Sequence, residues 1–152
     1  MRLPPKRYEV YIDGASHGNP GPAGVGVVFR EIAAPGEQGT VAREFSRYIG
    51  ETTNNVAEYL ALVYALQEAL LAGIQSLTIK TDSELLAHQV NGRYAVRNGQ
   101  LRLFHDLVLH LVGGLRAWSI EHIPRTQNTA ADRLAGQAVK HAPCLPASRQ
   151  QR

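Results

Sequence analysis

Two short, apolar-rich runs in the chain, YEVYID and LTIKTD, each end in an aspartate, Asp13 and Asp82. Each aspartate is followed at once by residues that favour a turn or the start of a helix. If the runs form neighbouring parallel strands, the two carboxylates lie side by side at one edge of the sheet, because adjacent strands are about 4.8 Å apart. Repulsion between the two charges makes it unfavourable for both to be ionised there unless a cation lies between them. The pattern therefore predicts a site for a divalent metal.

The order of the expected elements indicates an α/β fold. Periodicity and turn formers predict strands at 8–13, 25–29, 41–49, 77–81 and 115–123, helices at 55–72, 83–90, 101–112 and 128–141, and a tight loop at 14–24. The first three strands are expected to form an antiparallel meander. Right-handed crossovers then place strand 77–81 parallel to strand 8–13, in a mixed sheet with helices on its faces.

Length and composition narrow the possibilities. At 152 residues the chain is expected to form one domain, residues 8–141, with an N-terminal extension at 1–7 and a flexible C-terminal tail at 142–152. No apolar run approaches the roughly 18 residues that cross a bilayer, and residues 1–7 lack the apolar part of a secretory signal. The single cysteine, Cys144, cannot form an internal disulfide. We therefore expect a cytoplasmic monomer that needs no membrane and no small-molecule cofactor.

The basic residues favour a polyanionic partner. The net charge is +3, and 13 of the 16 basic residues are arginine, the side chain that binds phosphate bidentately. If a cluster of acids is neutralised by metal, the rest of the surface is clearly basic.

Two more acids, Glu58 and Asp132, are candidates for the metal site, although ordinary structural explanations also exist. Asp13 could simply open a turn with Gly14. Glu58 could close a capping box onto the amide of Asn55. Asp132 could lie on a solvated helix face.

Asp82 has an alternative of the same kind, because it could cap the helix expected at 83–90, where Thr81 and Glu84 offer a competing capping box. The four acids together favour function: three lie where a strand or loop meets the next element, and the fourth lies on the first turn of a helix. Oxygen ligands without clustered His or Cys indicate a hard cation such as Mg²⁺. Two such ions about 3.5–4 Å apart can activate a water and stabilise the leaving oxygen of a phosphodiester.

Four segments carry a resemblance to a known family. They are IDGASHGNPGPAGVG around Asp13, TTNNVAEYLAL around Glu58, KTDSELL around Asp82 and NTAADRLA around Asp132. From about residue 8 to 140, in order and spacing, the chain resembles type 1 ribonuclease H, in its short form without the basic handle helix. The resemblance implies the ribonuclease H-like fold, a five-stranded mixed sheet flanked by helices. It also implies weaker hybrid binding than in handle-bearing members, with a shallow salt dependence.

The resemblance also implies an activity. Asp13 would bridge two Mg²⁺ ions, Glu58 and Asp82 would complete the first metal site, and Asp132 would complete the second, with Mn²⁺ as a possible substitute. The implied reaction is endonucleolytic hydrolysis of the RNA strand of an RNA/DNA hybrid, which leaves 5′-phosphate and 3′-hydroxyl ends. No protein nucleophile is required.

Short polar residues are the candidates for substrate binding. Asn19, Asn54 and Asn55 match family positions that hydrogen-bond the nucleic-acid backbone and the 2′-hydroxyls. Thr53 matches a contributor to the pocket for a DNA-strand phosphate. Turn and cap chemistry is the ordinary explanation for all four, and both uses can hold at once. Reading a 2′-hydroxyl would distinguish RNA from DNA.

A basic residue is expected beside the metals, and there are two candidates. By count, His122, ten residues before Asp132, matches the histidine thought to help product leave in the best-known bacterial pattern. The HIPR form of this stretch, however, resembles the shorter branch of the family, in which an arginine takes that role. We favour Arg125 over His122.

Two other functions are compatible with the same fold. A DNA nuclease of the transposase or resolvase kind usually carries extra DNA-binding domains. We expect the 152 residues of this chain to be too few for a further domain of that kind. A non-catalytic nucleic-acid binder would be marked by the loss of a metal ligand, whereas all four acids are present.

Overall fold

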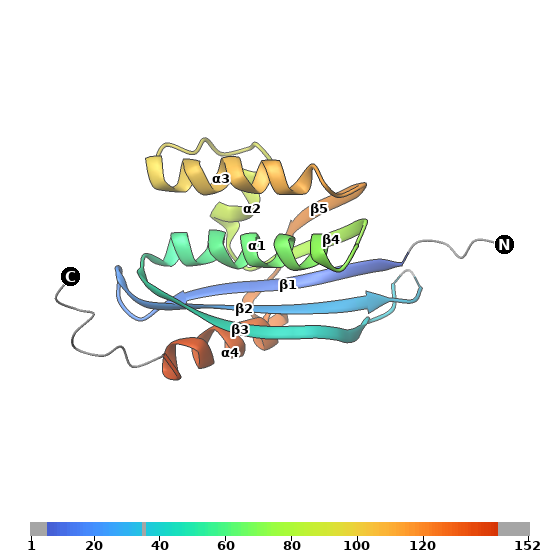
Figure 1. Ribbon diagram of the computed structural model, residues 1–152, viewed down its shortest axis with the longest axis horizontal. Helices are drawn as coiled ribbons and strands as arrows, with labels where there is room; N and C mark the ends of the chain where they lie inside the picture. The colour runs from blue at the N-terminus through green and yellow to red at the C-terminus, as the bar shows by residue number, and fades with distance from the viewer. Residues whose placement is uncertain (1–5, 35, 143–152) are drawn as a thin grey trace.

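The computed structural model describes residues 6–34 and 36–142, so most of the expected extension and tail, and Cys144, lie outside the described residues. A five-stranded sheet in the order β3-β2-β1-β4-β5 forms the centre of the molecule (Figure 1). Its strands are β1 (Arg7–Ser16), β2 (Gly21–Ile32), β3 (Thr40–Thr52), β4 (Ser76–Thr81) and β5 (Ala117–His122). The mixed α/β sheet expected from the sequence is confirmed.

Helices cover both faces of the sheet. They are α1 (Asn54–Leu71), α2 (Glu84–Val90), α3 (Gly99–Val112) and α4 (Thr129–Lys140), with a short 3₁₀ turn, η1 (Arg125–Gln127), before α4. Helices α1, α2 and α3 lie on one side, and α4 lies on the other (Figure 1). Among the described residues, none of the helices combines the length and hydrophobicity needed to cross a bilayer.

The register of the sheet brings Asp13 and Asp82 together, although β1 continues three residues beyond Asp13. Strands β1, β2 and β3 form the expected antiparallel meander, and β1 pairs with β4 in parallel. Ile12 is the register partner of Thr81, so Asp13 and Asp82 both follow the same step of the ladder. The sequence prediction that these carboxylates meet at one edge is therefore confirmed.

The expected loop at 14–24 is wrong for most of its length. Strand β1 continues to Ser16 and β2 already begins at Gly21, so only residues 17–20 connect them. Gly14 pairs with Val25 inside the ladder. The small residues of this segment indicated turns, but most of them lie in strands.

The main core lies between α1 and the sheet. Ile12, Val27 and Ile79 from the strands are fully buried, as are Leu62 and Leu66 from α1. Burial of such side chains contributes about 1.5–3 kcal/mol each, which fixes α1 against the central strands.

Two glycines let helix backbones approach the central strands unusually closely. A Cβ atom at Gly14 would overlap the backbone of Ala57 and Glu58 in α1. A Cβ atom at Gly26, the register partner of Asp13, would overlap the carbonyl oxygen of Ala131 in α4. Only glycine permits these contacts, and each one brings an acid-bearing helix turn next to Asp13.

Replacing the first of these glycines should therefore disturb the fold. We expect Gly14→Ala to lower the free energy of unfolding by about 3 kcal/mol, because the new methyl group meets backbone that cannot rotate away. Urea unfolding followed by circular dichroism measures the change. Gly136→Ala is the matched control: it lies in α4 with open space around its Cβ position, and it should raise stability by about 0.5–1 kcal/mol. Equal stability of Gly14→Ala and the unaltered protein would contradict the prediction.

Candidate active site

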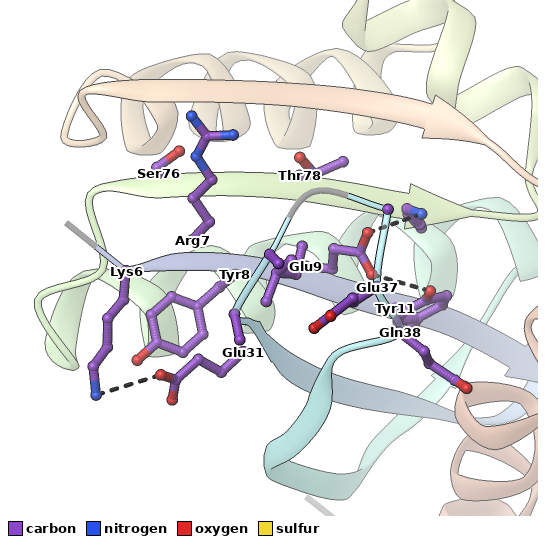
Figure 2. A pocket seen from close by; sticks show the side chains of 15 residues that line it. Lys6, Arg7, Tyr8, Glu9, Tyr11, Glu31, Glu37, Gln38, Ser76 and Thr78 are labelled. Carbon is purple, nitrogen blue, oxygen red and sulfur yellow. Dashed lines mark hydrogen bonds and ion pairs between the residues drawn. The ribbon is translucent and has the colours of Figure 1, made fainter. Parts of the chain in front are cut away.

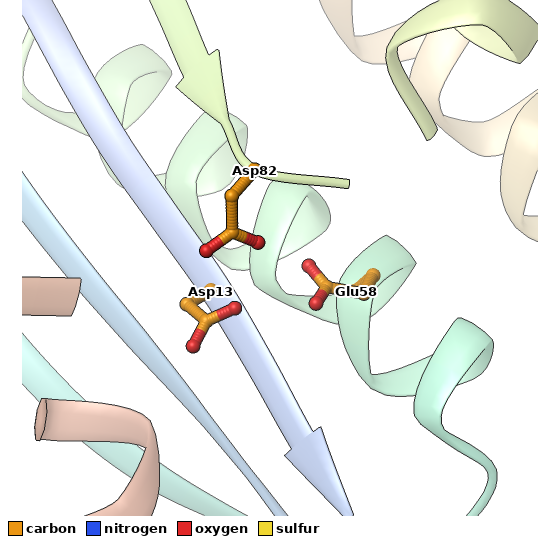
Figure 3. Close-up of side chains that lie close together, drawn as sticks. All are labelled: Asp13, Glu58 and Asp82. Carbon is orange, nitrogen blue, oxygen red and sulfur yellow. The ribbon is translucent and has the colours of Figure 1, made fainter. Parts of the chain in front are cut away.

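Three carboxylates meet beside the C-terminal half of β1. Asp13 comes from β1, Glu58 from the second turn of α1, and Asp82 from the residue after β4 (Figure 3). One oxygen of each lies within 4.8 Å of the others. Asp13 and Glu58 are only 5% and 6% exposed, and Asp82 is half-buried. The structure thus gathers three of the four acids predicted from the sequence.

The ordinary structural explanations for Asp13 and Glu58 are wrong. Asp13 opens no turn, because β1 continues through Ser16. Helix α1 is capped by Thr53, whose hydroxyl accepts a hydrogen bond from the amide of Val56 at 3.3 Å. Glu58 is therefore not needed as a capping-box partner, and its buried Oε2 has no hydrogen-bond partner among the described residues.

Asp82 is likewise free of the capping role that its position suggests. Ser83 caps α2, and its hydroxyl accepts from the amide of Leu86 at 3.1 Å. The competing box is not formed, because the hydroxyl of Thr81 accepts from the amide of Ser83 at 3.1 Å instead. The carboxylate of Asp82 points toward Asp13 (Figure 3).

Burial and mutual repulsion make this cluster hold protons. Burial, followed by the charge of Asp82, raises the pKa of Asp13 to about 7. Burial, followed by the charge of Asp13, raises the pKa of Glu58 well above its usual value. A cation among the three would favour the ionised carboxylates and so offset both effects. The donor set consists only of carboxylate oxygens and includes the unpartnered Oε2 of Glu58, so it fits a hard divalent cation.

Asp132 lies at the rim of the cluster. It is on the first turn of α4, and it is close enough to contribute to the raised pKa of Asp13. Its Oδ1 is 3.6 Å from Nη2 of Arg125, and the two side chains are 43% and 81% exposed. This exposed pair contributes little to stability, but it places a guanidinium beside the fourth acid. His122 ends β5 with an exposed side chain and forms none of the ion pairs of the described residues.

The predicted substrate-binding residues gather near the start of α1. The side-chain oxygen of Asn19, in the 17–20 connection, accepts a hydrogen bond from the amide of Asn54 at 3.1 Å. Asn19, Asn54 and Asn55 are exposed, and Thr53 is half-buried as the helix cap. Turn and cap chemistry is thus present, and three of these four polar side chains remain accessible.

A second hollow of the described residues lies away from the carboxylate cluster. It has a volume of about 920 Å³ and opens over the N-terminal half of β1, beside the loop between β2 and β3 (Figure 2). Two side chains in its lining bind the same carboxylate: Nζ of Lys80 is 3.1 Å from Glu9, and the hydroxyl of Tyr11 donates to Glu9 at 3.2 Å. None of the four acids lines it. The carboxylate cluster is therefore the better candidate for chemistry.

One residue of the site was missed by sequence reasoning. Asn128, just before α4, is 1% exposed, and its side-chain nitrogen donates to Oδ2 of Asp82 at 3.3 Å. The one available signal was an asparagine four residues before Asp132, which also describes an ordinary helix cap.

Comparison with known proteins agrees with this geometry. A family model described as reverse transcriptase-like matches residues 11–138. The ribonuclease HI of Halobacterium salinarum is 41% identical over 136 residues, which cover 90% of this chain and 66% of the relative. The chain belongs to the type 1 ribonuclease H family. The crystal structure of RNase H1 from the same archaeon matches with a TM-score of 0.83 at 39% identity, over 90% of this chain and 99% of the solved one.

A second solved structure similar to this chain is also a type 1 ribonuclease H. LC11-RNase H1 in complex with RNA/DNA hybrid matches with a TM-score of 0.81 at 38% identity, over 90% of this chain and 99% of the solved one. Some curated members of the family are longer: the chain spans 66% of the Halobacterium ribonuclease HI and 35% of a bifunctional Mycobacterium tuberculosis protein. The ribonuclease H family and fold expected from the sequence are confirmed.

The raised pKa of Asp13 predicts how stability depends on pH without metal. The folded state holds this proton up to about pH 7 and the unfolded chain only to about 3.8. The carboxyl therefore costs little at pH 4 and increasingly destabilises the fold as pH rises to 7. In chelator, Asp13→Asn should exceed the unaltered protein in stability by as much as about 4 kcal/mol at pH 8 and by little at pH 4. Urea unfolding at both pH values measures this.

Asp106→Asn is the control, because its side chain is 71% exposed on α3. The difference in free energy of unfolding between Asp106→Asn and the unaltered protein should be the same at pH 4 and pH 8. A difference for Asp13→Asn that is the same at both pH values would show that the carboxyl is not destabilised in the fold.

Proposed function

We propose that this chain is an endoribonuclease that hydrolyses the RNA strand of RNA/DNA hybrids and depends on Mg²⁺, leaving 5′-phosphate and 3′-hydroxyl ends. The observation that carries the proposal is the set of three carboxylates within 4.8 Å, two of them buried. Family membership supports it, and so does the relative solved in complex with RNA/DNA hybrid.

The four acids would hold two ions. Asp13 would be shared, Glu58 and Asp82 would complete one site, and Asp132 would complete the other, with Mn²⁺ as a possible substitute. When bound, the two ions would supply a Lewis-acid environment for the attacking water and for the leaving oxygen. Glu58 and Asp13 are well suited to hold an ion firmly, because burial and the close contact of α1 with β1 restrict their movement.

The remaining residues would bind and orient the substrate. Asn19, Asn54 and Asn55 would contact the backbone and the 2′-hydroxyls of the RNA strand, and Thr53 would contribute to binding a phosphate of the DNA strand. The hydrogen bond between Asn19 and the amide of Asn54 supports this, because it joins the 17–20 connection to the start of α1 as one polar surface.

A basic group would stand beside the acids to balance charge as product leaves. Arg125 is the better candidate, because its guanidinium lies 3.6 Å from Asp132. His122 remains the alternative. We further propose that residues 8–141 act as one monomeric, cytoplasmic domain whose partner is the hybrid. The competing functions, a DNA nuclease and a non-catalytic binder, are outcomes of the test below.

The decisive test compares substrates and metals. The protein should cleave labelled RNA/DNA hybrid with Mg²⁺ or Mn²⁺, and it should leave double-stranded RNA and double-stranded DNA intact. Chelator should abolish cleavage. Asp13→Asn should lower the rate by at least about 100-fold, because bound ions lower the free energy of the charged transition state by several kcal/mol. Gel analysis of the product ends completes the measurement.

Asp106→Asn is the matched control, since it removes an exposed aspartate far from the cluster in sequence and should cleave at the rate of the unaltered protein. Equal cutting of duplex DNA would favour the DNA nuclease. Hybrid binding without cutting would favour the non-catalytic binder.

A pH–rate profile separates the two basic candidates. Histidine side chains can change their charge within the accessible pH range, whereas arginine side chains do not. We expect Arg125→Ala to lower kcat roughly tenfold or more at every pH. His122→Ala should keep both the rate and the shape of the profile. If neither variant loses activity, neither residue assists.

A further inference from the structure

Asn128 occupies an unusual position between the acids. It is 1% exposed and directly precedes α4. Its Nδ2 donates to the carbonyl oxygen of Ile12 at 2.9 Å and to Oδ2 of Asp82 at 3.3 Å. Its backbone carbonyl oxygen accepts from the backbone amide of Asp132 at 3.1 Å. One buried residue therefore contacts the strand just before Asp13, the carboxylate of Asp82 and the backbone of Asp132.

The chemistry of the two acceptors determines which group can stand there. A peptide carbonyl and a carboxylate can only accept, so the amide nitrogen of Asn128 must face them and its oxygen must face away. The nitrogen has two hydrogens, and each has one acceptor. An aspartate at 128 would present oxygen to oxygen, a serine would supply one hydrogen, and an alanine would supply none.

This orientation leaves the other end of the amide unsatisfied. Oδ1 of Asn128 is buried and has no hydrogen-bond partner among the described residues. Such a group costs about 1–3 kcal/mol. A residue chosen only to join α4 to the sheet would not need this cost, because Ser46 joins them by donating from its hydroxyl to the carbonyl of Leu134 at 2.7 Å. The two hydrogens of Asn128 are donated to the backbone beside Asp13 and to the carboxylate of Asp82.

We propose that Asn128 is a positioning residue: it holds the carboxylate of Asp82 in a fixed orientation beside Asp13 and so raises the affinity of the acid cluster for a divalent cation. The inference rests on the metal site of the proposed function. Hydrogen bonds that orient metal-binding carboxylates typically change metal affinity by 10- to 100-fold. Asn128 is buried, so this effect should appear in metal binding and not in the affinity for nucleic acid.

Calorimetric titration of the protein alone with Mn²⁺ tests the proposal without any nuclease assay. Asn128→Ala should bind Mn²⁺ about 10- to 100-fold more weakly than the unaltered protein. Its KM for RNA/DNA hybrid at saturating metal should stay within about twofold. Asn128→Ser keeps one donor and should lie between the two proteins in Mn²⁺ affinity; it carries the test if Asn128→Ala does not fold.

Ser46→Ala is the matched control, because it removes a side-chain hydrogen bond between the sheet and α4 while leaving the acids untouched. It should keep Mn²⁺ affinity within about twofold. Wild-type Mn²⁺ affinity in a folded Asn128→Ala or Asn128→Ser variant would overturn the proposal. So would an equal loss of affinity in Ser46→Ala, since attachment of α4 would then explain the effect.

A double variant shows whether the effect of Asn128 on Mn²⁺ affinity depends on Asp82. In Asp82→Asn, adding Asn128→Ala should cause little further loss of Mn²⁺ affinity, whereas a full additional loss would show that Asn128 acts by another route. Cleavage of hybrid by the unaltered protein is measured in parallel. Cleavage together with unchanged metal binding in the Asn128 variants would refute this inference alone, whereas absence of cleavage would refute the proposed function.

Discussion

Close contact of two helix backbones with the central strands determines where the acidic side chains of the site lie. Helix α1 touches β1 at Gly14, and α4 touches β2 at Gly26, on the opposite faces of the sheet. Asp13 immediately precedes the first glycine and is the register partner of the second. It therefore lies beside both of these close contacts. Any larger residue at either glycine would push a helix outward, and with it Glu58 or Asp132.

This geometry assembles the acids against their electrostatic preference. Folding brings three carboxylates within 4.8 Å and buries two of them, so the pKa of Asp13 rises to about 7. Burial of the apolar side chains between α1 and the sheet supplies the free energy that holds the arrangement. A divalent cation would offset this electrostatic cost, because the same burial that penalises bare carboxylates strengthens their attraction to an ion. Such local conflict with the rest of the fold is typical of functional sites.

Much of this could be predicted from the sequence because it depends on short-range patterns. Strand-like runs that end in Asp13 and Asp82 imply adjacent carboxylates once the strands are parallel, and the structure has that register. The segment 14–24 could not be assigned correctly, because the same small residues suit a turn and a close helix contact. Which of the two occurs depends on α1 and α4, which lie far along the chain. Asn128 shows the same limit, since its acceptors are 116 and 46 residues away.

The sequence allowed two roles for Glu58 and Asp82, helix capping or membership of the carboxylate cluster, and the structure shows the second. Glu58 fits a capping box by spacing, yet Thr53 caps α1 with its own hydroxyl and leaves the glutamate to the cluster. Ser83 does the same for Asp82 by capping α2. In both cases a neighbouring hydroxyl satisfies the helix start, so the carboxylate is available for chemistry. The hydroxyl at the start of each helix, from Thr53 or Ser83, is therefore part of the reason that the carboxylate can face the cluster.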